Sequence, residues 1–399
     1  MVCVNYLWYT IIKKENVMKI LITSDLYTTA TNGVVTSLKN LCGELEKKGH
    51  EVRILSFSNN KHSRKEGNVY LLRSLPFPVY PDVRLPIFAR RHEYVKEIIA
   101  WKPDVIHSQC EYFSFGYAKY ISKKTKAPIV HTYHTLYEQY VTYVIPIRRL
   151  GEWLVRVFSR KRLKRTKVII APTYKVEQTL RGYKIENEIA VVPSGISLDQ
   201  HKKRLAPEER SKRRNELGIS DDKKVLINLG RLGNEKNIDE LITFFAKACE
   251  KRDDLRFLIV GGGPAKEALE KHAEKLGVAD KVIFTGMVPP TEVQNYYQLG
   301  DLFVGASTSE TQGLTYVEAS ACGLPLLCRK DLCLMGVLFE GENGYEYTCE
   351  QEFLEYLDKI ANSSEWRTAA SKKGEEISEL FDKTHFGDSV EALYNKSIK

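Results

Sequence analysis

The chain lacks the features of membrane-spanning and disulfide-stabilised proteins. No apolar run approaches the roughly 20 residues that a helix needs to cross a bilayer, and runs such as 168–172 and 257–260 have only the length of strands. The eight cysteines show neither a CxxC pair nor the Cys/His spacing of a metal site, so we expect reduced, mostly buried thiols in a cytosolic protein. Residues 1–17 have no basic start and no cleavage site of a signal peptide, and we interpret them as an N-terminal tail.

Two cofactor signatures are also missing. No complete GxGxxG loop is present, which argues against a dinucleotide site. No DxD metal motif stands in a suitable loop, since Asp221-Asp222 and Asp253-Asp254 fall in polar connections. The sequence therefore predicts no tightly bound cofactor and no metal.

The positive charge of the chain is concentrated in its first half. The formal net charge is +9; residues 18–195 hold 30 Lys/Arg against 15 Asp/Glu, and residues 196–399 hold 28 against 35. Such a field favours an anionic partner, which by charge alone is a membrane, a nucleic acid or an anionic substrate. The basic residues lack RNA-binding aromatics and a recognition-helix motif, so we expect no nucleic acid.

Strand-like and helix-like segments alternate along the 399 residues, which suit two domains. We expect an α/β fold with two doubly wound Rossmann-like domains facing across a cleft, with ligands beyond the carboxyl ends of the strands. The predicted boundaries are a tail at 1–17, a first Rossmann-like domain at 18–197, a second at 198–378, and a C-terminal helix at 379–399 that crosses back to the first domain.

The stretch SETQGLTYVEASACGLP at 309–325 is the most informative one. If a helix begins near Gly313, Glu310 lies in the loop before it and Glu318 on its second turn, on the order of 10 Å apart. One carboxylate can then accept hydrogen bonds from a sugar and the other from a ribose, while the free amides at the helix start suit a diphosphate. The alternative is a surface helix that carries two incidental glutamates.

A second candidate is GRLGNEKN at 230–237, directly after a predicted strand. Arg231 and Lys236 flank a turn there, and two cations at a strand end can neutralise a leaving diphosphate. The alternative is a solvated basic loop.

Together these motifs and the repeated α/β pattern resemble the retaining family-4 glycosyltransferases of GT-B fold over nearly all of residues 18–399. The resemblance implies that Arg231 and Lys236 contact the donor diphosphate, that Glu310 binds the transferred sugar and that Glu318 binds the ribose. It also implies a nucleotide-sugar donor and retention of the anomeric configuration, for which we hypothesise a front-face displacement. The donor-binding backbone it implies comprises Gln312, Gly313, Leu314 and Thr315.

In the first half, Asn32-Gly33-Val34-Val35 resembles the family's glycine loop, although many members have two glycines there. Gly33 and Val34 are therefore expected beside the donor. His134 in HTYHT matches the family's cleft histidine and is expected near the reacting carbon; the alternative is a satisfied core histidine. His131 is the weaker candidate, because its place within the strand indicates packing.

Residues 147–167 carry nine Lys/Arg, one Glu and an apolar set at helical spacing, the profile of an interfacial amphipathic helix. The alternative is a helix that packs on the sheet and solvates its far side. Residues 74–88, with aromatics between prolines, are expected to form a loop. The candidate membrane and acceptor residues are Arg148, Arg149, Trp153, Arg156, Phe158, Arg160 and Lys161.

The segments SETQGLTYVEA at 309–319 and TYHTLYEQY at 132–140 are most similar to those of bacterial diacylglycerol glucosyltransferases. This resemblance implies UDP-glucose as donor, diacylglycerol as acceptor, an anionic membrane surface as partner, and a peripheral position on the cytoplasmic face of the cell membrane. Two alternatives stay open: a family-4 transferase with another lipid or a soluble acceptor, and a GT-B-fold sugar-nucleotide epimerase.

Overall fold

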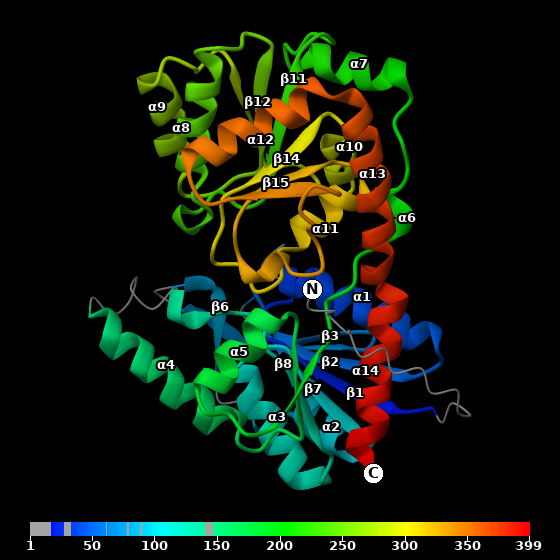
Figure 1. Cartoon of the computed structure of the whole chain (residues 1–399). Coiled ribbons are helices and arrows are strands. Elements are labelled where there is room, and N and C mark those ends of the chain that lie inside the picture. Colours follow the sequence, from blue (N-terminus) through cyan, green and yellow to red (C-terminus); the bar gives the residue numbers. More distant parts are fainter. Residues whose placement is uncertain (1–16, 28–32, 61, 78–79, 88–89, 140–146) are drawn as a thin grey trace. The chain divides into compact units, whose positions relative to one another are not determined.

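The computed structural model describes residues 17–27, 33–60, 62–77, 80–87, 90–139 and 147–399. The chain divides into two compact units, each built around its own sheet (Figure 1). Unit 1 comprises residues 1–196 together with 383–399, and unit 2 comprises residues 197–382.

The sheet of unit 1 has eight strands in the order β10-β9-β8-β7-β1-β2-β4-β3. All pairs are parallel except β3 with β4. Because β1 lies between β2 and β7, the strand order reverses at β1 and β7, where ligands bind in open α/β sheets. The strands are β1 (Lys19–Thr23), β2 (Glu51–Phe57), β3 (Arg64–Glu66), β4 (Val69–Leu72), β7 (Val105–Ser108), β8 (Ile129–Thr132), β9 (Val168–Ala171) and β10 (Glu188–Val191).

Helices cover both faces of this sheet, as a buried parallel sheet requires. One buried cluster joins Leu21, Ile106 and Ile169 to α2, α3, α4 and α5, and the other joins Ile20 and Val130 to α1 and α14. The helices are α1 (Gly33–Lys47), α2 (Glu93–Trp101), α3 (Phe113–Thr125), η1 (Tyr137–Gln139), α4 (Arg148–Leu163), α5 (Tyr174–Gly182) and α14 (Lys383–Ile398).

Helix α14 comes from the far end of the chain but packs on α1 and β7. Its approach depends on Gly195. The φ of Gly195 is not positive; instead, a Cβ there would lie 2.5 Å from Cα of Lys383 and 2.8 Å from Cβ of Phe386. Gly195 is thus required for close packing rather than for a left-handed turn.

The sheet of unit 2 has the order β13-β12-β11-β14-β15-β16, all parallel. This is the Rossmann order, with its reversal between β11 and β14. The strands are β11 (Lys224–Leu229), β12 (Leu255–Val260), β13 (Val282–Gly286), β14 (Leu302–Gly305), β15 (Leu326–Arg329) and β16 (Gly344–Tyr347).

The helices of unit 2 bury a core around Phe245, Phe257 and Phe353. Helix α7 is also tied to the start of the central strand β14, because the buried Arg214 donates to Asp301 and to the carbonyl of Leu299. The helices are α6 (Leu198–His201), α7 (Pro207–Glu216), η3 (Asn234–Lys236), α8 (Ile238–Cys249), α9 (Lys266–Lys275), α10 (Val293–Tyr297), α11 (Leu314–Ala321), η4 (Leu332–Leu334), α12 (Glu350–Asn362), α13 (Ser364–Ser378) and η5 (Glu379–Phe381).

The prediction of a loop at 74–88 is wrong. Residues Ser74–Phe77 (β5) and Tyr80–Pro86 (β6) pair as an antiparallel two-stranded sheet. A proline removes one ladder donor but is tolerated in an edge strand, and each strand of a two-stranded sheet has one unpaired edge. The proline content therefore did not prevent pairing.

Candidate active site

The loops after β11 and β14 meet at the switch point of the unit 2 sheet. Asn237 ends the first loop in a left-handed conformation, with φ of +50°, and its side-chain amide donates to the carbonyl of Ala306 over 3.1 Å. Ser309 Oγ of the second loop donates to the carbonyl of Glu235 over 3.2 Å. These two bonds fasten GRLGNEKN to the segment that carries Glu310.

Each cation of the first loop lies beside a carboxylate. Lys236 Nζ donates to Glu310 Oε1 at 2.5 Å, and the two side chains are 27% and 18% exposed. Arg231 pairs with Glu235, and its side chain is 48% exposed. The structure therefore brings Arg231, Lys236 and Glu310 together at the carboxyl ends of β11 and β14.

Three glycines after β12 let a third loop approach the same place. A Cβ on Gly261 would stand 1.9 Å from the carbonyl oxygen of Gly230, and a Cβ on Gly263 would stand 2.3 Å from that of Leu232. The amide of Leu232 in turn donates to the carbonyl of Gly262 over 2.9 Å. The GGGP stretch thus supports the backbone around Arg231, and a side chain at Gly261 or Gly263 would push the two loops apart.

Helix α11 begins directly after Gly313, whose φ is +72°. A Cβ at Gly313 would lie 2.4 Å from the ring of Tyr316, so glycine is required on both conformational and steric grounds. Gln312 is buried, while Leu314 and Thr315 are half-buried at the first helical positions. The first backbone N–H groups of a helix have no intrahelical partner and carry a partial positive charge.

Glu310 lies in the loop before α11 and Glu318 lies within the helix. Glu318 Oε2 accepts from the hydroxyl of Tyr297 at 2.9 Å. Burial, and after it the negative charge of Glu318, raises the pKa of Tyr297 well above its ordinary value, so this hydroxyl stays a donor. Tyr297 therefore orients Glu318, a role that no feature of the sequence signalled.

In unit 1, His134 follows β8 and is half-buried. Its Nε2 lies 2.7 Å from Oε1 of Gln109. Since an amide oxygen only accepts, Nε2 carries the proton and Nδ1 is an acceptor. Burial, with a smaller contribution from His131, lowers the pKa of His134 to about 3, so the ring is neutral near pH 7. Gln109 follows β7, and its position at the end of a switch-point strand is the signal that points to it.

His131 lies in the core, fully buried, with Nε2 3.0 Å from Oε1 of Glu111. The other oxygen of Glu111 accepts from the hydroxyl of Tyr137. A third histidine, His107, sits between the Tyr394 hydroxyl at 2.6 Å and Thr132 Oγ1 at 2.8 Å, and burial lowers its pKa well below the ordinary value.

The sequence reasoning missed Asp25, which follows β1 and is buried. Its carboxyl group accepts from the backbone amides of Phe113 and Ser114 and from Ser114 Oγ, at 3.0, 2.9 and 3.0 Å. It therefore satisfies the start of α3. Burial outweighs these hydrogen bonds and raises the pKa of Asp25 to about 6.

The remaining predicted residues of unit 1 lie on two helices. Gly33 and Val34 open α1; Gly33 is exposed and Val34 half-buried. Helix α4 buries Gly151, Val155, Ser159 and Leu163 and exposes a row of large apolar side chains. That row is Ile147 (just before the helix), Leu150, Trp153, Leu154 and Val157. Phe158 is not part of it, because it is half-buried with its ring 6.0 Å from that of Tyr112.

Cations border the exposed row of α4. Arg148, Arg149, Arg156, Arg160 and Lys161 are all exposed. Arg148 pairs with Glu152 at 2.8 Å and Arg156 with Glu138 at 3.1 Å. Within the described ranges no helix is long and apolar enough to cross a membrane. The same residues contain no group of three His, Cys, Asp or Glu side chains that could hold a metal ion.

Comparison with known proteins decides the family. The family described as Glycosyltransferase Family 4 matches residues 31–200, and that described as Glycosyl transferases group 1 matches residues 209–377. An alpha-monoglucosyldiacylglycerol synthase of Streptococcus pneumoniae is 34% identical over 96% of this chain and 86% of its own length. A protein of the same name from Acholeplasma laidlawii is 32% identical over 94% of this chain and 96% of its own.

This chain belongs to the family-4 glycosyltransferases.

Solved structures of glycosyltransferases share the fold. Anabaena HepE, solved in complex with UDP and glucose, superposes with a TM-score of 0.74 over 95% of this chain and 100% of its own, at 16% identity. Sucrose-phosphate synthase from Thermosynechococcus elongatus gives a TM-score of 0.76 over 94% of this chain and 98% of its own, at 18% identity. The two Rossmann-like units of this glycosyltransferase are thus those of the GT-B fold.

Proposed function

We propose that this glycosyltransferase moves glucose from UDP-glucose to 1,2-diacylglycerol, with retention of the anomeric configuration, at an anionic membrane surface on the cytoplasmic face of the cell membrane. The observation that carries the proposal is the cluster of Arg231, Lys236 and Glu310 beside the start of α11, at the switch point of the unit 2 sheet. In this proposal residues 198–378 hold the donor, residues 18–197 hold the acceptor, and the final helix belongs with the acceptor side.

The donor is assigned by charge and spacing. A diphosphate placed before α11 meets two cations and the unpaired amides of the helix start, which together stabilise negative charge. Glu310 then accepts from sugar hydroxyls and Glu318, oriented by Tyr297, accepts from the ribose hydroxyls. The uridine and the glucose come from the relatives, since HepE was solved with UDP and glucose and both synthases are named for a glucosyl product.

The chemical step follows from where charge develops. As the bond from the sugar to the diphosphate breaks, negative charge grows on the leaving oxygen beside Lys236 and Arg231. Each well-placed donor at such a position contributes about 3 kcal/mol. The acceptor oxygen bonds to the anomeric carbon on the face that the diphosphate leaves, and the leaving phosphate takes the proton of the acceptor hydroxyl, so that the configuration is retained. Neutral His134, with Nδ1 as acceptor, binds a hydroxyl of the transferred sugar.

The lipid acceptor is supported by helix α4. Its exposed apolar row and bordering cations are arranged as in helices that lie in a membrane interface. Each Lys or Arg near an anionic surface contributes about 1 kcal/mol. The names of the two synthases supply diacylglycerol.

The test is an assay of the purified chain with a panel of UDP-sugars and diacylglycerol in anionic vesicles. We expect a monoglucosyl diacylglycerol that forms with UDP-glucose and whose anomeric proton shows an α linkage by NMR. A β linkage would overturn retention, and vesicle-independent transfer to a water-soluble acceptor would overturn the lipid assignment. A new sugar nucleotide formed without any acceptor would indicate an epimerase.

A further inference from the structure

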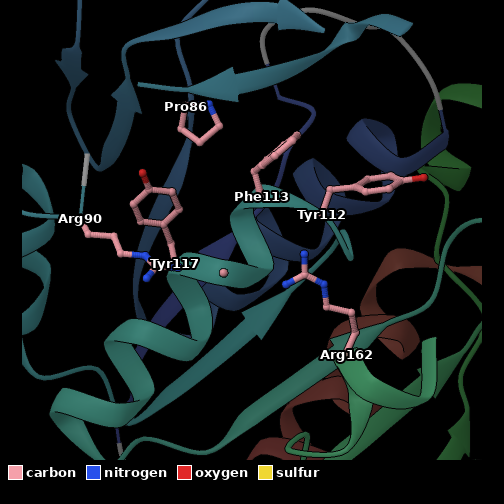
Figure 2. A pocket seen from close by; sticks show the side chains of 7 residues that line it. Pro86, Arg90, Tyr112, Phe113, Tyr117 and Arg162 are labelled. Atoms are coloured by element: carbon pink, nitrogen blue, oxygen red, sulfur yellow. The ribbon is translucent and has the colours of Figure 1, made fainter. Parts of the chain in front are cut away.

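A pocket in unit 1 lies between α3, β6 and the last turn of α4. Its volume is about 170 Å³. Figure 2 shows Arg90 and Arg162 reaching it from two sides. The walls are formed by Pro86, Tyr112, Phe113 and Tyr117 together with these two arginines.

Gly116 opens the pocket on the α3 side. A Cβ at this position would lie 3.9 Å from Nη2 of Arg90, so any longer side chain would enter the space that the guanidinium faces. Helix α3 runs without a break from Phe113 to Thr125, and Gly116 lies near its start. A glycine inside a helix costs about 1 kcal/mol relative to alanine, and here it leaves room beside a cation.

The pocket is positively charged, and within the described part of the chain neither arginine has a carboxylate partner. Arg90 lies over the ring of Tyr120 at 5.9 Å and Arg162 over that of Phe158 at 5.2 Å. The neighbouring Glu111 is buried and already engaged by His131 and Tyr137. Like charges that face one cavity repel each other, and an anion bound there relieves the repulsion.

The positive charge of Arg162 also acts on Lys119, which lies on α3. Its pKa lies below the ordinary value, first because of burial and then because of the positive charges of Arg162, Arg165 and Lys161. Its Nζ lies 5.2 Å from the ring centre of Phe115. The lining of the pocket itself contains two arginines and no acidic residue.

We propose that this pocket binds the phosphate ester of an anionic phospholipid headgroup between the guanidinium groups of Arg90 and Arg162. Arginine matches phosphate oxygens in a planar, bidentate geometry. The volume is below the range of about 300–1,000 Å³ typical of pockets that enclose whole organic ligands, which suits a headgroup rather than a nucleotide sugar. The lipid source is favoured because Arg162 belongs to α4, whose exposed apolar row we place in the membrane interface; to this extent the inference rests on the proposed function.

This site differs from general attraction to a charged surface, because it distinguishes one headgroup from another. The test compares binding of the full chain to two kinds of phosphatidylcholine vesicle with equal surface charge. One contains phosphatidylglycerol, a phosphodiester, and the other contains oleate, a carboxylate without phosphate. The variants are Arg90→Gln and Arg162→Gln, and the matched control is Arg91→Gln, which removes the same charge from an exposed neighbour outside the pocket.

We expect Arg90→Gln and Arg162→Gln each to weaken binding to phosphatidylglycerol vesicles by about tenfold, the usual scale of one charge-assisted hydrogen bond. Binding to oleate vesicles should change much less, and Arg91→Gln should change both by a similar small factor. If inorganic phosphate competes with phosphatidylglycerol in the unaltered protein but not in Arg90→Gln, the pocket also takes free phosphate, which supports the chemistry with a soluble source. If both pocket variants behave like Arg91→Gln on both vesicles, the site does not exist.

The outcome is separable from that of the proposed function. Glucosyl transfer is measured separately, with the unaltered chain and diacylglycerol in detergent micelles, and this measurement judges only the proposed function. Failure of the unaltered chain to form a glycolipid in micelles would overturn the function while the vesicle comparison still judged the pocket. Unchanged thermal unfolding of Arg90→Gln would show that lost binding is not lost folding.

Discussion

The two units hold chemically different groups at the equivalent edges of their sheets. After the strands of unit 1 lie Asp25, Gln109 and His134, which are buried or half-buried and hydrogen-bonded. After β11 and β14 of unit 2 lie ion pairs that are partly open to solvent, Lys236 with Glu310 and Arg231 with Glu235. One unit thus presents buried or half-buried hydrogen-bonding groups, and the other presents ion pairs that are partly open to solvent.

The difference follows from burial. A histidine removed from water keeps its neutral form, and the pKa of His134 accordingly falls to about 3. Lys236 instead stays partly hydrated, with a carboxylate oxygen of Glu310 2.5 Å from its Nζ. Neutral groups suit sugar hydroxyls, whereas opposite charges suit a substrate that carries both a diphosphate and hydroxyls. The same topology therefore supports two kinds of recognition.

Substitution of Lys236, in the charged loop after β11, is expected to have the largest effect on activity. Replacing Lys236→Ala is expected to lower kcat by about 10²–10³-fold, because the departing diphosphate loses a cation, while donor affinity changes far less. Steady-state kinetics with UDP-glucose measures both. Lys275→Ala, an exposed lysine on α9, is the control and should leave kcat unaltered. Equal turnover in Lys236→Ala would remove the proposed role.

The free energy of unfolding is expected to depend on pH through the buried Asp25 of unit 1. Its folded pKa of about 6 lies above the ordinary 3.8, so between these values the folded state binds more protons and the free energy of unfolding falls as pH rises. Asp25→Asn removes this decrease in the free energy of unfolding, which amounts to about 3 kcal/mol at most. Denaturant unfolding at steps from pH 4 to pH 7 measures the free energy of unfolding, and its slope against pH should be more positive in the variant than in the wild-type protein.

The exposed Asp280, in unit 2, supplies the control for that measurement. Asp280→Asn should leave the slope of the wild-type protein between pH 4 and pH 6 in place. A wild-type slope unchanged by Asp25→Asn would mean that this carboxyl group titrates normally in the folded chain.

Substitution of Glu318 tests whether its carboxylate binds the ribose of the donor. Glu318→Gln should raise KM for UDP-glucose by about tenfold, since it weakens hydrogen bonds made to a charged acceptor. The discrimination against a 2′-deoxyribose donor should shrink at the same time, and Tyr297→Phe should show a smaller loss of the same kind because it only frees Glu318 to move. Glu274→Gln, on the exposed face of α9, is the control. Full discrimination in Glu318→Gln would contradict the assignment.

The smallest expected effect concerns the membrane face. Trp153→Ser on α4 removes a side chain that is 55% exposed, and vesicle binding should weaken by about fivefold because about 1 kcal/mol of apolar burial is lost. Co-sedimentation with anionic vesicles measures this. Met287→Ser, an exposed apolar residue of unit 2, is the control; an equal loss in both variants would mean that α4 is not the contact surface.

The failures of the sequence interpretation have physical causes. The 74–88 segment was expected to be a loop because of its prolines, but cross-strand pairing tolerated them at the edge of a two-stranded sheet. Strands β3, β4 and β16 are missing from the predicted elements. β3 consists of three charged residues that no apolar pattern marks, and it is held by pairing with β4. β4 and β16 pair with β2 and β15 at the sides of their sheets. Phe158 was grouped with the exposed apolar row, yet it packs beside Tyr112.

Local sequence was sufficient for the alternation of strands and helices, for the loop position of Glu310 and the helical position of Glu318, and for the family, because hydrophobic periodicity and short motifs are properties of neighbouring residues. Only the tertiary structure pairs Lys236 with Glu310 and brings the Tyr297 hydroxyl to Glu318. It also brings Asp25 to the first amides of α3 and places Arg90 and Arg162 in the lining of one pocket. These contacts join residues separated by 21 to 89 positions in the chain. Their geometry depends on strand order and burial, which no local pattern specifies.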